Sequence, residues 1–249
     1  MNLTIDIGNT RSKFAAFSGD ELVRTDIEEG HALSSLTAFV GTDVVEAAIV
    51  SSVVDLPDAA LAVLDSLPCP VLTLTSGTPV PLVNLYRTPQ TLGTDRLAAA
   101  VGAAALAPHR TLLIIDAGSC VTFDMVTAAG EYVGGNIAPG IEARLRAIGD
   151  YFPRLPHVAA VGDVPELGYD TETAIRAGVI NGIRNEIEGC AARLSRRHPD
   201  LLVFITGGDT GCLHEDMPVE VRHEPYCVPI GLNRILRYNI NLQHTTNNR

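Results

Sequence analysis

The sequence contains no apolar run as long as the roughly 18 residues that suggest a membrane span, and its start shows no basic segment followed by an apolar one. We therefore expect no membrane partner and a cytoplasmic location. Basic residues are also scarce: 18 Lys and Arg stand against 29 Asp and Glu, which gives a formal net charge of −11. Nonspecific nucleic-acid binding depends on a basic surface that displaces phosphate counterions, so we expect no nucleic-acid partner.

Several catalytic and ligand-binding motifs are missing as well. The sequence has no Gly-x-x-x-x-Gly-Lys-Ser/Thr loop and no Gly-x-Gly-x-x-Gly turn after a strand, which argues against P-loop kinases and Rossmann enzymes. It has no Gly-x-Ser-x-Gly elbow, so a serine hydrolase has little support. No Cys-x-x-Cys pair occurs. The odd number of widely spaced cysteines predicts reduced thiols rather than a zinc site: Cys69, Cys120, Cys190, Cys212 and Cys227.

Apolar mass is ample, because 249 residues with 46% hydrophobic side chains can bury one large core or two small ones. Apolar runs and turn residues predict an opening β-meander, then alternating helices and strands, a loop rich in Pro and Gly, and an alanine-rich helix. The expected strands are 3–7, 13–17, 21–25, 44–50 and 71–74, the expected helices are 32–40, 56–67 and 95–107, and the expected loop is 77–93.

The opening pattern returns in the second part of the chain. The segment 113–118 (LIIDAG) repeats 3–8 (LTIDIG), with the acid, the glycine and the flanking apolar residues in register. Two similar halves, 1–110 and 111–249, are therefore expected, each starting with a three-stranded meander. In the second half we expect helices over 141–151, 171–197, 209–214 and 231–238, a strand over 201–206, and a frayed polar tail over 239–249.

Each repeat carries an Asp-x-Gly hairpin, and the pair predicts a phosphate site. A glycine hairpin allows backbone N–H groups to approach phosphate oxygens, and Asn9, Thr10 and Ser119 add hydrogen-bond donors. The carboxylates of Asp6 and Asp116 suit Mg²⁺, which proteins usually hold through water in such sites. Either acid alone fits a tight turn equally well, but the two hairpins together favour phosphate binding.

A third element, residues 205–209 (ITGGD), runs from a buried strand into two glycines. Gly207 and Gly208 leave room for an adenine ring against the backbone, and a helix start at this point favours nearby phosphate. The alternative is an ordinary turn with Asp209 as the helix N-cap.

These elements together resemble the superfamily of acetate and sugar kinases, Hsp70 and actin, which implies an α/β fold of two ribonuclease H-like halves, each a mixed sheet flanked by helices. Within it, the chain is similar to type III pantothenate kinase over about residues 3–236. The similarity rests on 6–10 (DIGNT), 84–93 (NLYRTPQTLG), 93–96 (GTDR), 115–119 (IDAGS), 134–140 (GGNIAPG) and 171–178 (TETAIRAG). Ser119 stands where the family usually has threonine, and it keeps the hydroxyl donor.

The resemblance implies transfer of the γ-phosphoryl group of ATP to the primary hydroxyl of pantothenate, the first step of coenzyme A synthesis, with Mg²⁺ as cofactor. It makes Asp95 the general base, and an ionised carboxylate can orient the hydroxyl and accept its proton. Without the resemblance, the residues allow simpler roles: Thr94 or Asp95 would only cap the alanine-rich helix. Lys13 would be a solvated charge on the hairpin. The implied pantothenate contacts are Tyr86, Gly93, Thr94 and Arg96. The implied ATP contacts are Asp6, Gly8, Asn9, Thr10, Arg11, Lys13, Gly118, Ser119, Thr122, Gly207 and Gly208.

Members of this family are dimers that need a monovalent cation, K⁺ or NH₄⁺, so the resemblance also implies a homodimer. Asp116 is the implied cation ligand, although the same carboxylate suits Mg²⁺. Thr171 is implied to complete the pantothenate pocket of the neighbouring subunit. The helix expected over 171–197 has a broad apolar face, which fits either a dimer interface or packing on its own sheet.

Two other functions fit the same motifs. Another kinase of the superfamily, acting on a sugar or an acyl acid, would keep the nucleotide motifs and change the pocket around 86–96. A noncatalytic ATP-binding regulator of the actin or Hsp70 type would share the two hairpins, but the Asp95-Arg96 pair and the short chain argue against it. A panel of acceptors separates the kinases, and nucleotide binding without acceptor turnover would identify the regulator.

Overall fold

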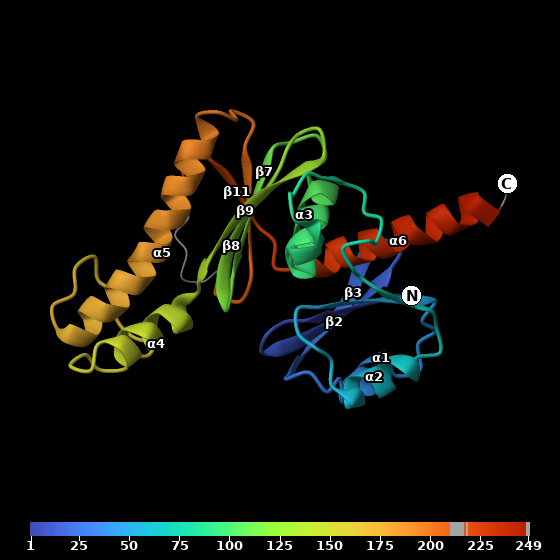
Figure 1. Cartoon of the computed structure of the whole chain (residues 1–249), viewed down its shortest axis with the longest axis horizontal. Helices are drawn as coiled ribbons and strands as arrows, with labels where there is room; N and C mark the ends of the chain where they lie inside the picture. The colour runs from blue at the N-terminus through green and yellow to red at the C-terminus, as the bar shows by residue number, and fades with distance from the viewer. Residues whose placement is uncertain (210–216, 218, 248–249) are drawn as a thin grey trace. The chain divides into compact units, whose positions relative to one another are not determined.

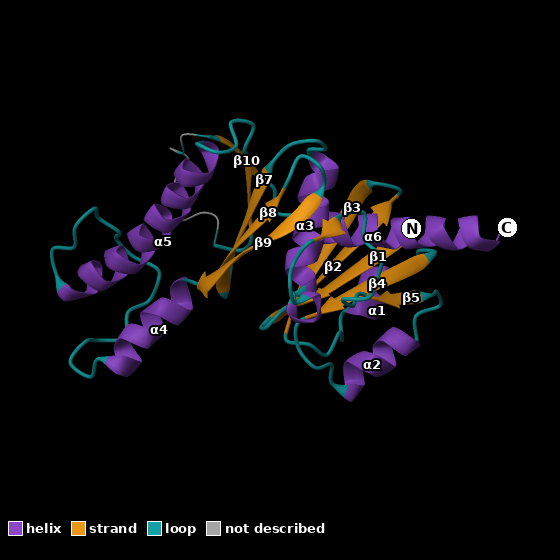
Figure 2. Ribbon diagram, turned by 45° about the horizontal axis from the view of Figure 1, so that its top comes forward, coloured by secondary structure: helices purple, strands orange, loops and turns teal. Residues whose placement is uncertain are grey.

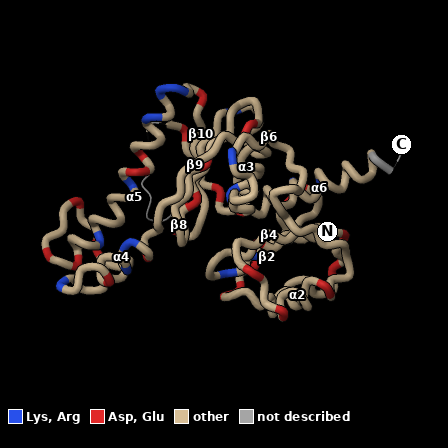
Figure 3. The backbone as a smooth tube through the Cα atoms, in the orientation of Figure 1, with Lys and Arg blue, Asp and Glu red and all other residues tan. Residues whose placement is uncertain are grey.

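The chain folds into two compact α/β units in a computed structural model that describes residues 1–209, 217 and 219–247 (Figure 1). Unit 1 comprises residues 1–109, 128–133 and 226–249, and unit 2 comprises 110–127 and 134–225. The C-terminal segment thus groups with the first unit by its contacts, whereas the repeat pattern assigns it to the second half. Acidic and basic positions are distributed over both units (Figure 3).

Unit 1 is built on a five-stranded sheet with the order β3-β2-β1-β4-β5. The strands β1 (Asn2–Ile7), β2 (Arg11–Ser18) and β3 (Glu21–Glu29) form the antiparallel meander, and β4 (Ala47–Ser52) and β5 (Val71–Thr73) continue the sheet in parallel. Alternation of side chains along β1 sends Leu3, Ile5 and Ile7 into one hydrophobic core, and Thr4 and Asp6 to the opposite face.

Helices cover both faces of this sheet (Figure 2). On the apolar face of β1, α1 (Leu36–Val40) and α2 (Asp58–Asp65) contribute buried side chains to the core. The other pair, α3 (Thr94–Leu106) and α6 (Cys227–Asn247), pack against each other and against the sheet. Gly102 and Gly231 allow this helix pair to approach so closely, because a Cβ at either position would overlap the backbone of the partner helix.

Unit 2 is built on a second sheet with the strand order β11-β10-β7-β8-β9. The strands are β7 (Leu112–Ala117), β8 (Cys120–Val126), β9 (Glu131–Pro139), β10 (Leu202–Thr206) and β11 (Glu220–His223). The strand β7 pairs antiparallel with β8 and parallel with β10. The short β6 (Val83–Asn84) pairs with the first residues of β9, which group with unit 1. Just before β7, the backbone N–H of Thr111 donates to the carboxylate of Asp200 at 3.0 Å, and this bond lowers the pKa of Asp200.

The helices α4 (Ile141–Tyr151) and α5 (Thr171–Ser195) share one hydrophobic core with β7, β8 and β10. The apolar face of α5 is therefore largely used within its own unit: Ile175, Val179, Ile180, Ile183 and Ile187 are buried. Among the described residues, no helix is both long and apolar enough to cross a bilayer.

Most expected elements are confirmed to within a few residues, including both meanders, α3, α4, α5 and β10. The helix expected over 32–40 begins only at Leu36, because the carboxylate of Glu28 binds the backbone N–H groups and hydroxyls of Ser34 and Ser35 in an irregular turn. Leu33 lies in this turn with a positive φ of 56°.

Two other expectations are wrong. The frayed tail expected over 239–249 is helical to Asn247, because α6 begins at Cys227 and packs on unit 1, where Asn239 donates from Nδ2 to the carbonyl of Pro79 at 2.8 Å. The loop expected over 77–93 contains β6 and a 3₁₀ turn at Pro89–Thr91. The strand β11 was not expected, and the helix expected over 209–214 lies outside the described residues.

Candidate active site

The first Asp-x-Gly hairpin joins β1 to β2 at one end of the unit 1 sheet. Gly8 closes the hairpin by donating its N–H to the carbonyl of Arg11 at 2.9 Å, and the side chains of Asn9 and Thr10 are exposed. The guanidinium of Arg11 forms an exposed ion pair with Glu29, with 2.7 Å between Nε and Oε1. The hairpin therefore presents backbone and side-chain donors to solvent at the carboxyl end of β1, while Arg11 is bound to a neighbouring strand.

Asp6 lies beside the two serines that end β4. The parallel register pairs Asp6 with Ser51 and Ile7 with Ser52, and Asp6 is buried. The hydroxyl oxygens of Ser51 and Thr94 are 2.9 Å apart, and the Thr94 hydroxyl also donates to the carbonyl of Ser52 at 3.4 Å. These bonds fix the first residue of α3 to the strand end that neighbours Asp6. The two serines were missed in the sequence, where the available signal was a polar pair directly after an apolar strand.

Asp95 lies in the first turn of α3, directly after Thr94, and its carboxylate is half-buried. Its Oδ1 accepts the N–H of Arg96 at 2.8 Å. Gly93 is the N-cap of α3, so the interpretation of Thr94 or Asp95 as a simple helix cap is wrong. A Cβ at Gly93 would lie 2.5 Å from Oδ1 of Asp95 and 3.6 Å from the stem of Arg96. The absence of a side chain at residue 93 therefore permits this carboxylate position.

Arg96 and Tyr86 are held differently from each other. Arg96 is buried, with 6% of its surface exposed. Tyr86 is half-buried after β6, and its ring lies edge-on to the buried ring of Tyr132, with 6.1 Å between centroids. Its backbone N–H donates to Oδ1 of Asn84 at 3.0 Å. Arg96 and Tyr86 are therefore both anchored in unit 1, and in the sequence they lie on either side of Gly93.

The second Asp-x-Gly hairpin joins β7 to β8 in unit 2. Gly118 closes it by donating its N–H to the carbonyl of Cys120 at 2.9 Å, and Ser119 is exposed. Gly140 donates its N–H to the carbonyl of Ser119 at 3.1 Å, and a Cβ on Gly140 would overlap the carbonyl of Gly118. Because Gly140 is also the N-cap of α4, the hairpin lies against a helix N-terminus, where an anion is favoured.

The two hairpins share a layout. Asp6 is opposed by Lys13 on β2, and Asp116 is opposed by Thr122 on β8. Directly opposed residues of antiparallel strands lie on the same face of the sheet, so each acid has a polar neighbour one strand away. Lys13 is exposed and Thr122 is half-buried.

The Gly207-Gly208 turn lies against the second hairpin. The register pairs Thr206 of β10 with Asp116 of β7. Gly207 has a φ of 101°, and a Cβ there would overlap the carbonyl of Ala117 and lie 2.5 Å from Oδ1 of Asp116. Gly208 has open space around its Cα. The turn is therefore a bare backbone surface next to the Asp116 carboxylate.

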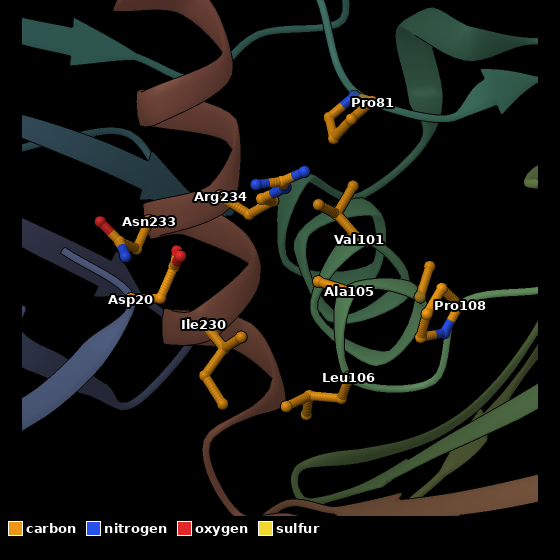
Figure 4. Close-up of a pocket in the computed structure, with 10 residues that line it drawn as sticks. Asp20, Pro81, Val101, Ala105, Leu106, Pro108, Ile230, Asn233 and Arg234 are labelled. Carbon is orange, nitrogen blue, oxygen red and sulfur yellow. The ribbon is translucent and has the colours of Figure 1, made fainter.

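The contacts described above bring together part of the expected site residues in each unit. Unit 1 gathers the first hairpin with the N-terminus of α3, and unit 2 gathers the second hairpin with the glycine turn. Thr171 belongs to neither cluster; it is exposed at the start of α5, next to Asp170, whose hydrogen bonds from the backbone and hydroxyl of Thr173 lower its pKa. A cavity of about 490 Å³ in unit 1 lies near the other end of α3 and is lined by none of the expected residues (Figure 4).

Comparison with known proteins decides the family. The sequence model of the family described as type III pantothenate kinase matches residues 2–193. The chain belongs to the type III pantothenate kinase family. A type III pantothenate kinase of Bacteroides fragilis is 47% identical over 239 residues, which cover 96% of this chain and 98% of that protein. A type III pantothenate kinase of Christiangramia forsetii is 33% identical over 241 residues, which cover 96% of this chain and 99% of that protein.

Solved structures confirm the fold that the resemblance implied. A Campylobacter jejuni protein assigned to the Baf family of transcriptional activators has a TM-score of 0.64 at 21% identity, covering 96% of this chain and 99% of that one. A Sinorhizobium meliloti protein assigned as a 2-dehydro-3-deoxygalactonokinase has a TM-score of 0.58 at 14% identity, covering 96% and 99%. Together with the two mixed sheets and their flanking helices, these matches confirm the expected α/β fold.

Proposed function

We propose that this chain transfers the γ-phosphoryl group of ATP to pantothenate, the family's reaction and the first step of coenzyme A synthesis, with Asp95 as the general base. The observation that carries the choice of base is the placement of Asp95 in the first turn of α3. Thr94 ties that turn to the end of β4, beside Asp6 and the first phosphate hairpin. A carboxylate held next to phosphate-binding backbone is suited to activate a hydroxyl acceptor.

In this proposal, Asp95 accepts the proton of the pantothenate hydroxyl while the new oxygen–phosphorus bond forms and the bond to ADP breaks. A carboxylate within hydrogen-bond reach of a hydroxyl can orient it and accept its proton. Within the described part of the chain, Oδ1 of Asp95 accepts a hydrogen bond from the backbone N–H of Arg96. Oδ2 is therefore the oxygen that would receive the proton. The bond to Oδ1 fixes the direction of Oδ2.

The donor set fits ATP and a divalent metal, which a kinase of this family requires. The hairpins around Gly8 and Gly118 would bind phosphate, and the bare turn at Gly207 and Gly208 would face the nucleoside. Bound Mg²⁺ supplies charge neutralisation on the phosphates. The described residues contain no group of three His, Cys, Asp or Glu side chains able to hold a metal, so Asp6 would hold Mg²⁺ through water.

Pantothenate would lie between the α3 N-terminus and the segment before it. Arg96 offers a fixed positive charge for the carboxylate or a polar oxygen of the substrate, and Tyr86 offers a ring and a hydroxyl. Gly93 keeps space open beside the Asp95 carboxylate, and Thr94 adds a hydroxyl at the same turn.

For the monovalent cation, K⁺ or NH₄⁺, we propose Asp116 as a ligand. Its Oδ1 faces the bare backbone of Gly207 in unit 2, where a carboxylate and nearby carbonyls would give a hard oxygen site. Replacing K⁺ by Na⁺ should lower kcat, and Asp116→Asn should raise the K⁺ concentration needed for half-maximal activity. An unchanged K⁺ dependence in Asp116→Asn would assign the cation elsewhere.

We also propose a homodimer that works in the cytoplasm, where ATP is consumed. Unit 2 exposes a row of large apolar side chains just before Thr171, and water contact with such a patch is unfavourable. They are Tyr151, Phe152, Leu155, Val161, Leu167 and Tyr169. A second copy covering this surface would fit the family role of Thr171, which completes the pantothenate pocket of the neighbouring subunit.

An acceptor panel tests the activity. ADP release from ATP and Mg²⁺ should depend on pantothenate, and the product should have the mass of pantothenate plus one phosphoryl group. Turnover with a hexose or acetate in place of pantothenate would favour another kinase of the superfamily. Nucleotide binding without turnover of any acceptor would favour a noncatalytic regulator.

A further inference from the structure

The turn from β9 into α4 packs backbone against backbone on the second Asp-x-Gly hairpin. Gly140 donates its N–H to the carbonyl of Ser119 at 3.1 Å, and a Cβ on Gly140 would overlap the carbonyl of Gly118. Because glycine leaves no side chain in between, a displacement of this turn is transmitted directly to the hairpin. The contacts that fix the turn therefore bear on the position of the hairpin.

Arg144 holds the other end of the same peptide group. Its Nε donates to the carbonyl of Pro139 at 2.7 Å. This carbonyl and the N–H of Gly140 belong to one planar peptide group and point in opposite directions. An oxygen held by Arg144 therefore directs the N–H towards Ser119. Arg144 also donates its backbone N–H to the carbonyl of Gly140 at 3.1 Å, so the carbonyls of Pro139 and Gly140 are bound by one residue.

The guanidinium of Arg144 is itself fixed by Glu186 on the neighbouring helix α5 (Figure 1). NH1 and NH2 each donate to one carboxylate oxygen at 2.7 Å, which is the bidentate geometry that suits a planar guanidinium. These hydrogen bonds lower the pKa of Glu186. Near Glu186 on the same helix, Ile183 and Ile187 are buried in the unit 2 core. The carboxylate is therefore carried by a helix that the core holds in place.

The pair is suited to geometry more than to stability. The side chains of Arg144 and Glu186 are 20% and 45% exposed, and ion pairs this open to water add little to folding stability. Each of the three guanidinium nitrogens already donates to a protein oxygen, at Pro139 or Glu186. Arg144 is thus placed to fix the turn rather than to bind a phosphate itself.

We propose that Arg144, held by Glu186, is a positioning residue for the nucleotide phosphates. It orients the peptide group before Gly140, and that peptide group sets the position of the hairpin at Gly118 and Ser119. The inference rests on the phosphate role proposed above for this hairpin. Because a misplaced donor makes a weaker hydrogen bond, ADP affinity depends on a side chain that acts through the backbone.

Arg110 provides a matched control in the same unit, because its contacts have the same pattern. Its Nε donates to the carbonyl of Asp200 at 2.9 Å and its NH2 donates to Glu220 at 3.0 Å, but it lies before β7, at the opposite end of that strand from the hairpin. Lysine keeps the charge and loses the planar fork. In calorimetry of the full chain with Mg²⁺, we expect Arg144→Lys to raise the Kd for ADP about tenfold and Arg110→Lys to leave it within about twofold.

A second variant tests whether Glu186 acts through Arg144. Glu186→Gln removes the charge and one acceptor oxygen from the group that binds Arg144. We expect it to raise the Kd for ADP about threefold or more. The double variant, Arg144→Lys with Glu186→Gln, should raise the Kd by less than the product of the two single effects, because both changes break the same contact.

The kinetic readout separates positioning from general destabilisation. The KM for pantothenate should stay within about twofold in all four variants, since its proposed contacts on the α3 side lie in unit 1. An equal Kd for ADP in Arg144→Lys and Arg110→Lys, a fully multiplicative double variant, or an equal rise in the pantothenate KM would overturn the inference. ADP binding is measured without pantothenate, so a wild-type chain that binds ADP and does not phosphorylate pantothenate would refute the proposed reaction alone.

Discussion

Replacing Asp95 by asparagine should lower kcat by about 10² to 10⁴, the usual contribution of a general base. This corresponds to about 2.7 to 5.4 kcal/mol in the barrier, at about 1.36 kcal/mol per decade. The structure indicates that little else changes. Asparagine keeps the carbonyl oxygen that accepts the Arg96 N–H at 2.8 Å, and it has the same outline beside Gly93. What the variant loses is the oxygen able to accept a proton.

A matched control isolates the charge effect. Asp58 lies exposed in the first turn of α2, as Asp95 lies in the first turn of α3, so Asp58→Asn removes the same favourable interaction with a helix N-terminus, about 0.3 to 1 kcal/mol, away from the site. Steady-state ADP release at saturating ATP gives kcat, and urea unfolding gives stability. A decrease in kcat of less than about tenfold in Asp95→Asn, or an equal loss of ADP affinity, would refute the assignment of the base.

Three further outcomes are expected. Gly93→Ala should lower kcat at least about tenfold with little change in the urea unfolding midpoint, because the new methyl group displaces the Asp95 carboxylate. Normal turnover in this variant would show that the position of the Asp95 carboxylate is not critical. Gly207→Ala should weaken ADP binding and cost about 1 to 3 kcal/mol of stability, which calorimetry and urea unfolding check. Gly208→Ala, at an open position, is the control for stability alone, and an equal loss of stability in both variants would contradict the reasoning. The folded-state pKa of Asp200 is lowered, so the stabilisation from its carboxylate is present above about pH 4 and is lost as the pH falls through that lowered value. Below about pH 4, the urea unfolding midpoint should therefore decline less steeply with falling pH in Asp200→Asn than in the wild-type chain. An identical pH profile in the two proteins would count against this contribution.

The sequence was sufficient to predict the two meanders and their hairpins, because alternation along short strands and glycine turns are local properties. The repeat of 3–8 at 113–118 added a second, independent observation of the same feature. The helices α4 and α5 were predicted from local sequence as well, and both begin at the expected positions.

Features that depend on distant contacts were not predictable in this way. The polar end of α6 is helical because its preceding turns pack on α3 at Gly102 and Gly231, a contact between segments far apart in the chain. Ser51 reaches the site through the pairing of β4 with β1 and through its hydrogen bond with Thr94, and no local pattern predicts either contact. The carbonyls of Ala159 and Asp163 are likewise bound by Arg176, a contact that no local sequence pattern predicts.

The central claim is that this chain phosphorylates pantothenate. The most direct measurement is the rate of ADP release by the purified protein with ATP, Mg²⁺ and K⁺, with and without pantothenate. Turnover that requires pantothenate is expected. ADP release that is absent in both samples, or equal in both, while ADP still binds, would contradict the account.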